Sequence, residues 1–159
     1  MFDFLNQKSV KFEDDRGFLE LLYEKDGVIL KRSRSKAGVF RGMHWQAPPF
    51  QQLKFIRVLS GRILDFVLDP LKEQKTLYYK EIGPQDQWVR IDSDLAHGFY
   101  ALEDVDFEYW CFGEYHESAE KAYSIKDFLT TTLKLENVSM SGKDVNAEKI
   151  TFLEAVCIK

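Results

Sequence analysis

Short runs of alternating apolar and polar residues follow one another along the first 125 residues, and turn-forming residues separate them. Val, Ile, Phe and Tyr are frequent in these runs, and such side chains suit the pleated, half-buried surface of a β-strand. No long helical period interrupts the series, so the pattern predicts an all-β fold, either a barrel or a two-sheet jelly roll. We expect strands over residues 9–13, 18–24, 27–35, 38–46, 52–61, 62–69, 77–83, 87–92, 96–103, 106–115 and 122–125.

The chain after residue 125 follows a different pattern, in which polar and apolar residues are mixed. This pattern predicts short C-terminal helices and leaves their boundaries open. The sequence contains no linker, repeat or low-complexity segment, and 159 residues is an ordinary length for one folded unit. We therefore expect a single domain over residues 1–159.

Composition and charge limit the kinds of molecule that the protein is expected to bind and the compartment in which it is expected to act. The formal net charge of -4 argues against nonspecific binding to nucleic acid, although a local basic cluster is enough to hold one phosphorylated ligand. No apolar run approaches the roughly 20 residues of a membrane helix. Residues 1–10 show no signal peptide, and Cys111 and Cys157 lack metal-ligand spacing, so free thiols in a reducing cytoplasm are expected.

Residues 38–61 contain more polar side chains than a plain β-hairpin needs. Strand alternation places Gly42, His44 and Gln46 on one face of the first strand of this pair. Polar groups that face the interior of a small barrel indicate a ligand cavity, because burying them without partners would be costly. The polar residues of this span are Arg41, His44, Gln46, Gln52, Lys54 and Arg57.

A histidine-based metal site usually takes two or three converging ligands, often from an H-x-H pair on one strand. The residue two positions after His44 is Gln46, and His97 would add a second imidazole to an otherwise weak ligand set. His116 lies in a polar stretch typical of a solvated turn. We therefore expect a metal-free site, where an imidazole with its ordinary pKa of about 6.5 suits a proton acceptor.

A proton acceptor needs an acid on the other side of the substrate and a group that stabilises negative charge. Tyr109 and Tyr115 lie six residues apart, so a straight strand would place both on one face. For either tyrosine alone, core packing with a hydrogen-bonded hydroxyl is the better interpretation. Lys54 would be merely solvated on an outer face, but facing inward it would stabilise a developing oxyanion.

Five segments of the chain carry a recognisable pattern: FEDDRGFLE, SRSKAGVFRGMHWQAPPFQQLKFIRVLSG, DLAHGFYALED, FEYWCFGEYHESAE and SGKDVNA. Taken in this order, they resemble segments of the dTDP-4-dehydrorhamnose 3,5-epimerase family, whose members are sugar-nucleotide epimerases with a cupin-type jelly-roll fold. The resemblance extends from about residue 9 to residue 150. Any one segment alone is a weak signal, but five in the same order are specific.

The resemblance implies a proton-transfer reaction next to a ketone at carbon 4 of the sugar. His44 matches the general base, and Asp144 matches the carboxylate that pairs with it. Tyr109 matches the acid that protonates the opposite face, and Lys54 matches the residue that stabilises the enolate oxygen. The family chemistry needs no metal and no redox cofactor.

The resemblance also implies how a nucleotide-diphosphate sugar is bound. Arg16, Phe18 and Glu20 match residues that reach into the site of the neighbouring subunit, which implies a homodimer. A second group of residues matches positions in the substrate-binding region, where arginine suits a diphosphate through its planar donor fork. This group comprises Arg41, Gln46, Arg57, His97 and Tyr115.

Some positions depart from the family pattern. Lys31 stands where the family has Asn or Asp, and the segment EYHESAE lacks the family's proline. The nucleotide (dTDP, CDP or GDP), the sugar and the number of inverted carbons are therefore undetermined. A sugar-nucleotide 3,4-ketoisomerase and a noncatalytic sugar-nucleotide-binding cupin are alternative functions, and a metal-dependent cupin dioxygenase is a more distant one.

Overall fold

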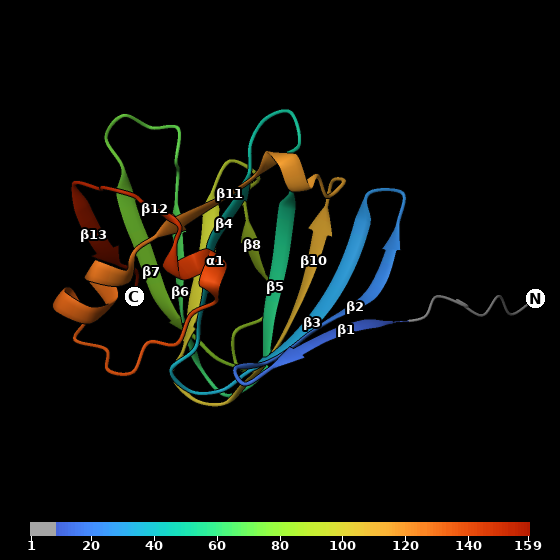
Figure 1. The fold of residues 1–159 in the computed structure, drawn as a ribbon, viewed down its shortest axis with the longest axis horizontal. Helices are drawn as coiled ribbons and strands as arrows, with labels where there is room; N and C mark the ends of the chain where they lie inside the picture. Colours follow the sequence, from blue (N-terminus) through green and yellow to red (C-terminus); the bar gives the residue numbers. More distant parts are fainter. Residues whose placement is uncertain (1–8) are drawn as a thin grey trace, which may run out of the picture.

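The computed structural model describes residues 9–159 as two β-sheets that face each other (Figure 1). Residues 1–8, which include most of the segment used to predict that no signal peptide is present, lie outside the described residues. The predicted all-β, cupin-type jelly roll with short C-terminal helices is confirmed. Within residues 9–159, no helix is long and apolar enough to cross a membrane.

Over residues 9–159 the two sheets contain thirteen strands, most of them in antiparallel pairs. The first sheet has the order β1 (Val10–Asp14), β2 (Gly17–Lys25), β3 (Val28–Ser35), β10 (Val105–Phe112), β5 (Leu53–Ser60) and β8 (Val89–Ile91). The second has the order β12 (Glu148–Lys149), β11 (Glu120–Ser124), β4 (Phe40–Gln46), β9 (Ala96–Ala101), β6 (Ile63–Leu68), β7 (Thr76–Ile82) and β13 (Glu154–Cys157). Figure 1 shows β1, β2 and β3 extending from one side of the molecule.

One hydrophobic core fills the space between the two sheets. Strand alternation supplies it, because every second side chain of β5 and β10 points toward the other sheet. Phe99 and Phe107 meet there with ring centroids 4.7 Å apart. The buried members of this core are Ile56, Val58, Ile63, Ile82, Ile91, Phe99, Ala101, Val105 and Phe107.

A second core lies on the other side of the seven-stranded sheet, where the C-terminal segment covers it. All six residues of β9 are buried as a result, since this strand has a packed layer on both faces. A π-helical turn over Phe128–Thr132 contributes Phe128, whose ring packs against Tyr79 at 5.8 Å and Phe152 at 5.5 Å. The C-terminal segment is thus fixed to the sheet by aromatic contacts.

The C-terminal segment also contains two strands that the sequence pattern did not predict. β12 pairs in parallel with β11, and β13 pairs in parallel with β7. Both are short and largely exposed, so they carry little periodic signal of their own. They form because the segment returns to sheet edges that are already present.

Strands β4 and β9 approach each other unusually closely at two glycines. A Cβ atom on Gly42 would lie 2.5 Å from the Cα atom of Gly98, and Gly42 has a φ of +124°. The register between the strands shifts between Arg41 and His44. The alternation expected for β4 is therefore interrupted, and Arg41 and His44, three residues apart, both face the same cavity.

We predict that Gly42→Ala destabilises the protein by about 2–4 kcal/mol, because the methyl group adds backbone strain and a clash with β9. Chemical denaturation monitored by circular dichroism measures this change. Gly142→Ala is the matched control, since a Cβ there meets no described atom within 4 Å. Equal stability of the two variants would contradict the assigned close approach.

Candidate active site

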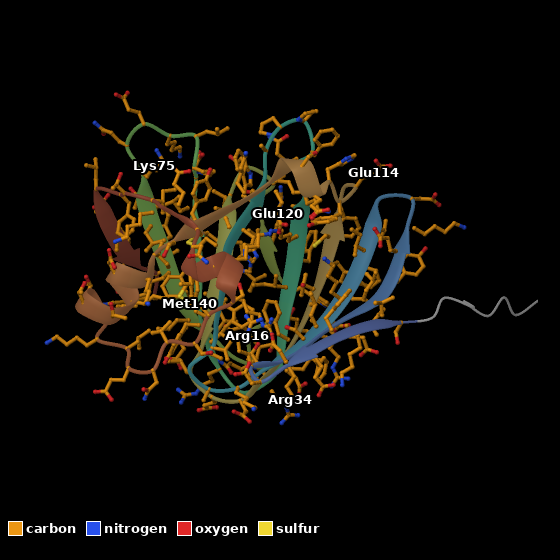
Figure 2. All side chains as sticks on the ribbon, in the orientation of Figure 1. Arg16, Arg34, Lys75, Glu114, Glu120 and Met140 are labelled. Carbon is orange, nitrogen blue, oxygen red and sulfur yellow. The ribbon has the colours of Figure 1, made fainter. Side chains whose placement is uncertain are left out.

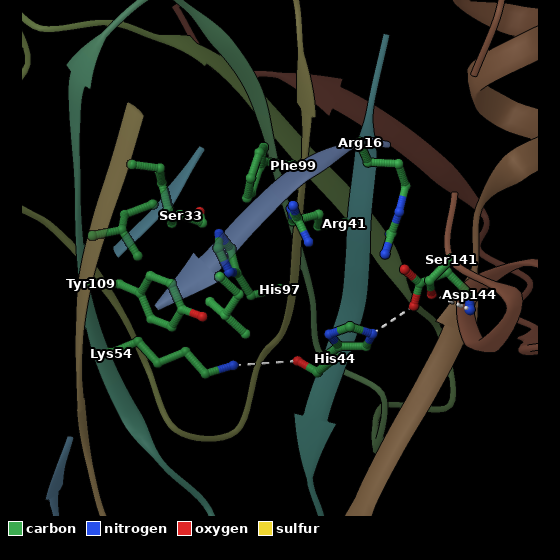
Figure 3. A pocket seen from close by; sticks show the side chains of 13 residues that line it. Arg16, Ser33, Arg41, His44, Lys54, His97, Phe99, Tyr109, Ser141 and Asp144 are labelled. Atoms are coloured by element: carbon green, nitrogen blue, oxygen red, sulfur yellow. Dashed lines mark hydrogen bonds and ion pairs between the residues drawn. The ribbon is translucent and has the colours of Figure 1, made fainter. Parts of the chain in front are cut away.

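A cavity of about 200 Å³ lies between the two sheets, and both sheets contribute to its wall (Figure 3). Most of its polar side chains come from β3, β4, β5, β9 and β10, and the remaining ones come from the two ends of the chain. The lining residues are Arg16, Leu19, Ser33, Arg41, His44, Lys54, Ile56, His97, Phe99, Phe107, Tyr109, Ser141 and Asp144.

His44 and Asp144 form a close pair at the edge of this cavity. His44 Nε2 lies 2.6 Å from Asp144 Oδ1, and the Asp144 side chain is only 3% exposed. Asp144 lies on the one-turn helix α1 (Gly142–Val145), where its backbone N–H donates to the Oγ of the N-cap residue Ser141. Burial raises the pKa of Asp144, but the hydrogen bonds from His44 and Ser141 outweigh it, and the net pKa is lowered.

An ionised Asp144 accepts a hydrogen bond from the Nε2–H of His44 and so orients the ring. Figure 3 shows the other ring nitrogen of His44 on the side that faces Tyr109 and Lys54. That nitrogen is then free to accept a proton from a bound molecule. The arrangement matches the base and its orienting carboxylate in many proton-transfer sites.

Tyr109 and Lys54 enter the cavity from the opposite sheet. Burial raises the pKa of the Tyr109 hydroxyl, so the phenol keeps its proton at neutral pH. Burial lowers the pKa of Lys54, whose Nζ donates to the His44 carbonyl oxygen at 3.4 Å. A proton acceptor on one wall thus faces a proton donor and an amine on the other.

Two arginines make another part of the cavity strongly basic. Arg41 is held by a hydrogen bond from its Nε to Ser35 Oγ at 2.8 Å, and Arg16 by Asp14. Arg16 Nη1 and Ser33 Oγ are buried, yet neither has a hydrogen-bond partner in the described part of the chain. Unsatisfied buried polar atoms in a cavity wall indicate a place for a polar ligand.

A second histidine–carboxylate pair adjoins the first. His97 Nε2 lies 2.6 Å from Asp65 Oδ1, with both side chains buried. His97 is the register partner of His44 across the β4–β9 ladder. Sequence reasoning missed Asp65, although a single carboxylate inside the apolar run of β6 was a usable signal. Among residues 9–159, no group of three or more His, Cys, Asp or Glu side chains is placed to hold a metal ion.

Gln46 does not line this cavity, although sequence reasoning placed it with His44. Its Nε2 donates to the carbonyl oxygens of Phe50 at 2.8 Å and Glu114 at 3.0 Å. Its Oε1 accepts the backbone N–H of His116 at 2.6 Å. All of its hydrogen-bonding groups are therefore used to connect two loops.

Arg57 also lies away from the cavity, on the outer face of the six-stranded sheet. It forms an ion pair with Glu108 at 2.8 Å and stacks on the Trp88 ring at 4.7 Å. Its neighbour along β5, Ile56, faces the cavity, so alternation turns Arg57 outward. Phe18 and Glu20 face the same outer side, because Leu19 between them lines the cavity.

Tyr115 lies outside β10, which ends at Phe112 where Gly113 turns the chain with a φ of +122°. Its ring lines a smaller neighbouring cavity of about 140 Å³, together with Lys31 and other residues. Its hydroxyl donates to Glu120 Oε2 at 2.8 Å. Tyr109 and Tyr115 are therefore separated, because the strand does not continue straight between them.

Comparisons with known proteins identify the relatives of this chain. The sequence model of the dTDP-4-dehydrorhamnose 3,5-epimerase family matches residues 3–151. The enzyme of that name from Shigella flexneri is 28% identical over 156 residues, which cover 87% of this chain and 86% of the relative. The crystal structure of the Sulfolobus tokodaii dTDP-4-dehydrorhamnose 3,5-epimerase superposes with a TM-score of 0.68 at 28% identity, covering 94% of each chain.

A further solved structure contains a bound sugar nucleotide. The dTDP-6-deoxy-D-glucose-3,5-epimerase from Legionella pneumophila, in complex with dTDP-4-keto-L-rhamnose, has a TM-score of 0.66 and 27% identity. The match covers 88% of this chain and 84% of that one. Fold and site together define a cupin-type isomerase of the sugar-nucleotide epimerase class. The chain belongs to the dTDP-4-dehydrorhamnose 3,5-epimerase family, as the sequence resemblance predicted.

We predict that Asp144→Asn lowers the free energy of unfolding at pH 7 by about 1–3 kcal/mol, because a charge-assisted hydrogen bond to His44 is lost. The folded-state pKa of Asp144 lies below its ordinary 3.8, so this stabilisation is present above pH 3.8 and disappears as the pH falls through the lowered value. Urea unfolding from pH 7 down to pH 3 measures it. If the difference in unfolding free energy between the wild-type protein and Asp144→Asn stays constant or grows as the pH falls, the lowered pKa of Asp144 is contradicted.

Proposed function

We propose that the protein inverts carbon 3, carbon 5 or both in a nucleotide-diphosphate-linked 4-keto-6-deoxy sugar. The observation that supports this most directly is the opposition of His44, paired with Asp144, to Tyr109 and Lys54 across one cavity. A base on one wall and an acid on the other can remove a proton from one face of a carbon and return one to the opposite face. That exchange is the chemistry of an epimerase.

In the proposed reaction, the free nitrogen of His44 takes the proton from the carbon beside the ketone. The electrons of the broken C–H bond move to the ketone oxygen and form an enolate, which Lys54 stabilises. Tyr109 then donates its hydroxyl proton to the opposite face of the same carbon, and the ketone forms again. His44 releases its proton to solvent and Tyr109 takes one up, so the cycle requires neither a metal nor a redox cofactor.

The rest of the cavity suits the remainder of such a substrate. We propose that Arg16 and Arg41 bind the diphosphate, and the unpartnered Nη1 of Arg16 supports this as an available donor. Leu19, Ile56 and Phe99 form an apolar wall that can receive the methyl group of a 6-deoxy sugar. His97, held by Asp65, is positioned to hydrogen-bond the sugar.

We further propose that two copies of the chain form a homodimer through the outer face of the six-stranded sheet. The resemblance assigns Arg16, Phe18 and Glu20 to a neighbouring site. Phe18 and Glu20 lie on this face, whereas Arg16 lines the cavity of its own chain. It also contains an apolar groove lined by Phe55, Trp88, Trp110 and Phe112, in which Trp88 is 39% and Phe112 is 40% exposed. Exposed aromatic side chains gathered on one sheet face are typical of a protein–protein interface.

We propose a single domain that acts in the cytoplasm, consistent with Cys111 and Cys157 being free thiols in the structure.

We predict that the protein incorporates solvent deuterium at carbon 3 or 5 of a dTDP-linked 4-keto-6-deoxy hexose, with a smaller or absent response to the CDP and GDP forms. His44→Ala removes the base and should lower the exchange rate about 10²–10⁴-fold. NMR or mass spectrometry of the recovered sugar nucleotide measures both results. Lack of exchange in the wild-type protein, or full exchange in the variant, would refute the proposal.

Analysis of the recovered sugar nucleotide also distinguishes the epimerase from the two alternative functions. A 3,4-ketoisomerase would return a sugar with its ketone at carbon 3, and a binding protein would bind the sugar nucleotide without exchange.

We predict that analytical ultracentrifugation shows twice the monomer mass and that Phe112→Glu shifts the protein toward the monomer, because a charge is placed in the apolar groove. Leu71→Glu is the matched control, since Leu71 is 64% exposed in a loop outside this face. A monomeric wild-type protein, or an unchanged dimer in Phe112→Glu, would exclude this interface.

A further inference from the structure

The helix that bears Asp144 has few apolar contacts to hold it in place. α1 is a single turn, and Asp144 is its buried residue. Val145 is 50% exposed, and the Lys143 side chain is 49% exposed. Because apolar packing is small here, polar contacts must set the distance between α1 and the sheet.

Glu120 supplies such a contact beside the His44–Asp144 pair. Its Oε2 lies 2.5 Å from Lys143 Nζ, and the same oxygen accepts the Tyr115 hydroxyl at 2.8 Å. The Glu120 side chain is 18% exposed, and in Figure 2 it lies nearer the middle of the view than Glu114. A half-buried carboxylate with two donors is more constrained than an exposed ion pair.

The position of Glu120 in the sheet connects it to His44. Glu120 is the first residue of β11, the strand that pairs with β4, and Ala122 on the same strand is the register partner of His44. Burial raises the pKa of Glu120, but the hydrogen bonds from Lys143 and Tyr115 and the nearby His44 lower it overall. Glu120 therefore stays ionised and can hold the Lys143 ammonium.

We propose that Glu120 is a positioning residue for proton transfer, which holds Lys143 and thereby keeps Asp144 at bonding distance from His44. This inference rests on the proposed epimerase function. Glu120 does not line the cavity, so it acts through α1 and not on the substrate. Small displacements of a catalytic pair have large effects on rate, because the reacting atoms must be held close to their productive geometry.

The first test is Glu120→Gln, which keeps the size of the side chain and an acceptor for Tyr115 but removes the charge that holds Lys143. We expect kcat to fall about 10-fold while KM changes less than about 2-fold. Lys143→Met removes the other partner from a half-exposed position and should have the same effect. The double variant of these two should be no slower than either one.

Asp144→Asn provides the test of mechanism. If Glu120 acts through Asp144, adding Glu120→Gln to Asp144→Asn should cause no further loss of kcat. Asp127→Asn is the matched control, because Asp127 forms an exposed 2.8 Å pair with Lys149 in the same part of the chain. It should retain the wild-type kcat.

A measurement without substrate distinguishes this inference from the proposed function. The His44 imidazole proton bonded to Asp144 should give a downfield proton NMR signal that is absent in Asp144→Asn. Glu120→Gln and Lys143→Met should broaden or weaken that signal, with unchanged circular dichroism. Wild-type kcat together with an unchanged signal in these variants, or additive losses with Asp144→Asn, would overturn the inference. A wild-type protein without deuterium exchange would refute the epimerase function instead, and the NMR result would still decide the role of Glu120.

Discussion

The contact between His44 and Asp144 joins two segments one hundred residues apart, and the site depends on it. His44 comes from a central strand that two cores hold in place, whereas Asp144 comes from a single helical turn with little apolar packing. The buried carboxylate is held in this position because the His44 imidazole donates to it, while the Oγ of the N-cap Ser141 accepts the Asp144 backbone N–H. The C-terminal segment therefore covers the sheet and also supplies part of the cavity wall.

Burial raises the pKa of Tyr109 and of Asp144 and lowers that of Lys54, and the resulting protonation states suit proton transfer. Tyr109 is kept neutral, so it holds a proton that it can give away. Lys54 has a lowered pKa because its ammonium is desolvated, which makes a nearby negative charge especially favourable. Asp144 remains ionised because specific hydrogen bonds outweigh its desolvation. The same cavity therefore brings together a proton donor, a proton acceptor and a buried amine.

Most of the strands, and the direction of two cavity side chains, could be predicted from the short-range alternation of apolar and polar residues. Alternation located eleven strands, and the inward direction of Lys54 and Tyr109 follows from the same period of two that places Ile56 and Phe107 in or beside the cavity. The period of two is interrupted at two places. The register shift beside Gly42 places Arg41 and His44 on one side, and the turn at Gly113 separates Tyr115 from Tyr109. The amide of Gln46 binds loop backbone, and two of its partners, Glu114 and His116, lie 68 and 70 residues away in the sequence.

By itself, the sequence determined the all-β class, the family and the residue types able to transfer a proton, because these depend on local periodicity and on motifs read in order. The tertiary structure alone decided which of those residues meet. It placed Arg57 outside and Asp65 inside, added the edge strands β12 and β13, and brought Glu120 and Lys143 together beside Asp144. The physical reason is that such contacts form between segments distant in the chain, where packing and burial select partners that no local pattern specifies.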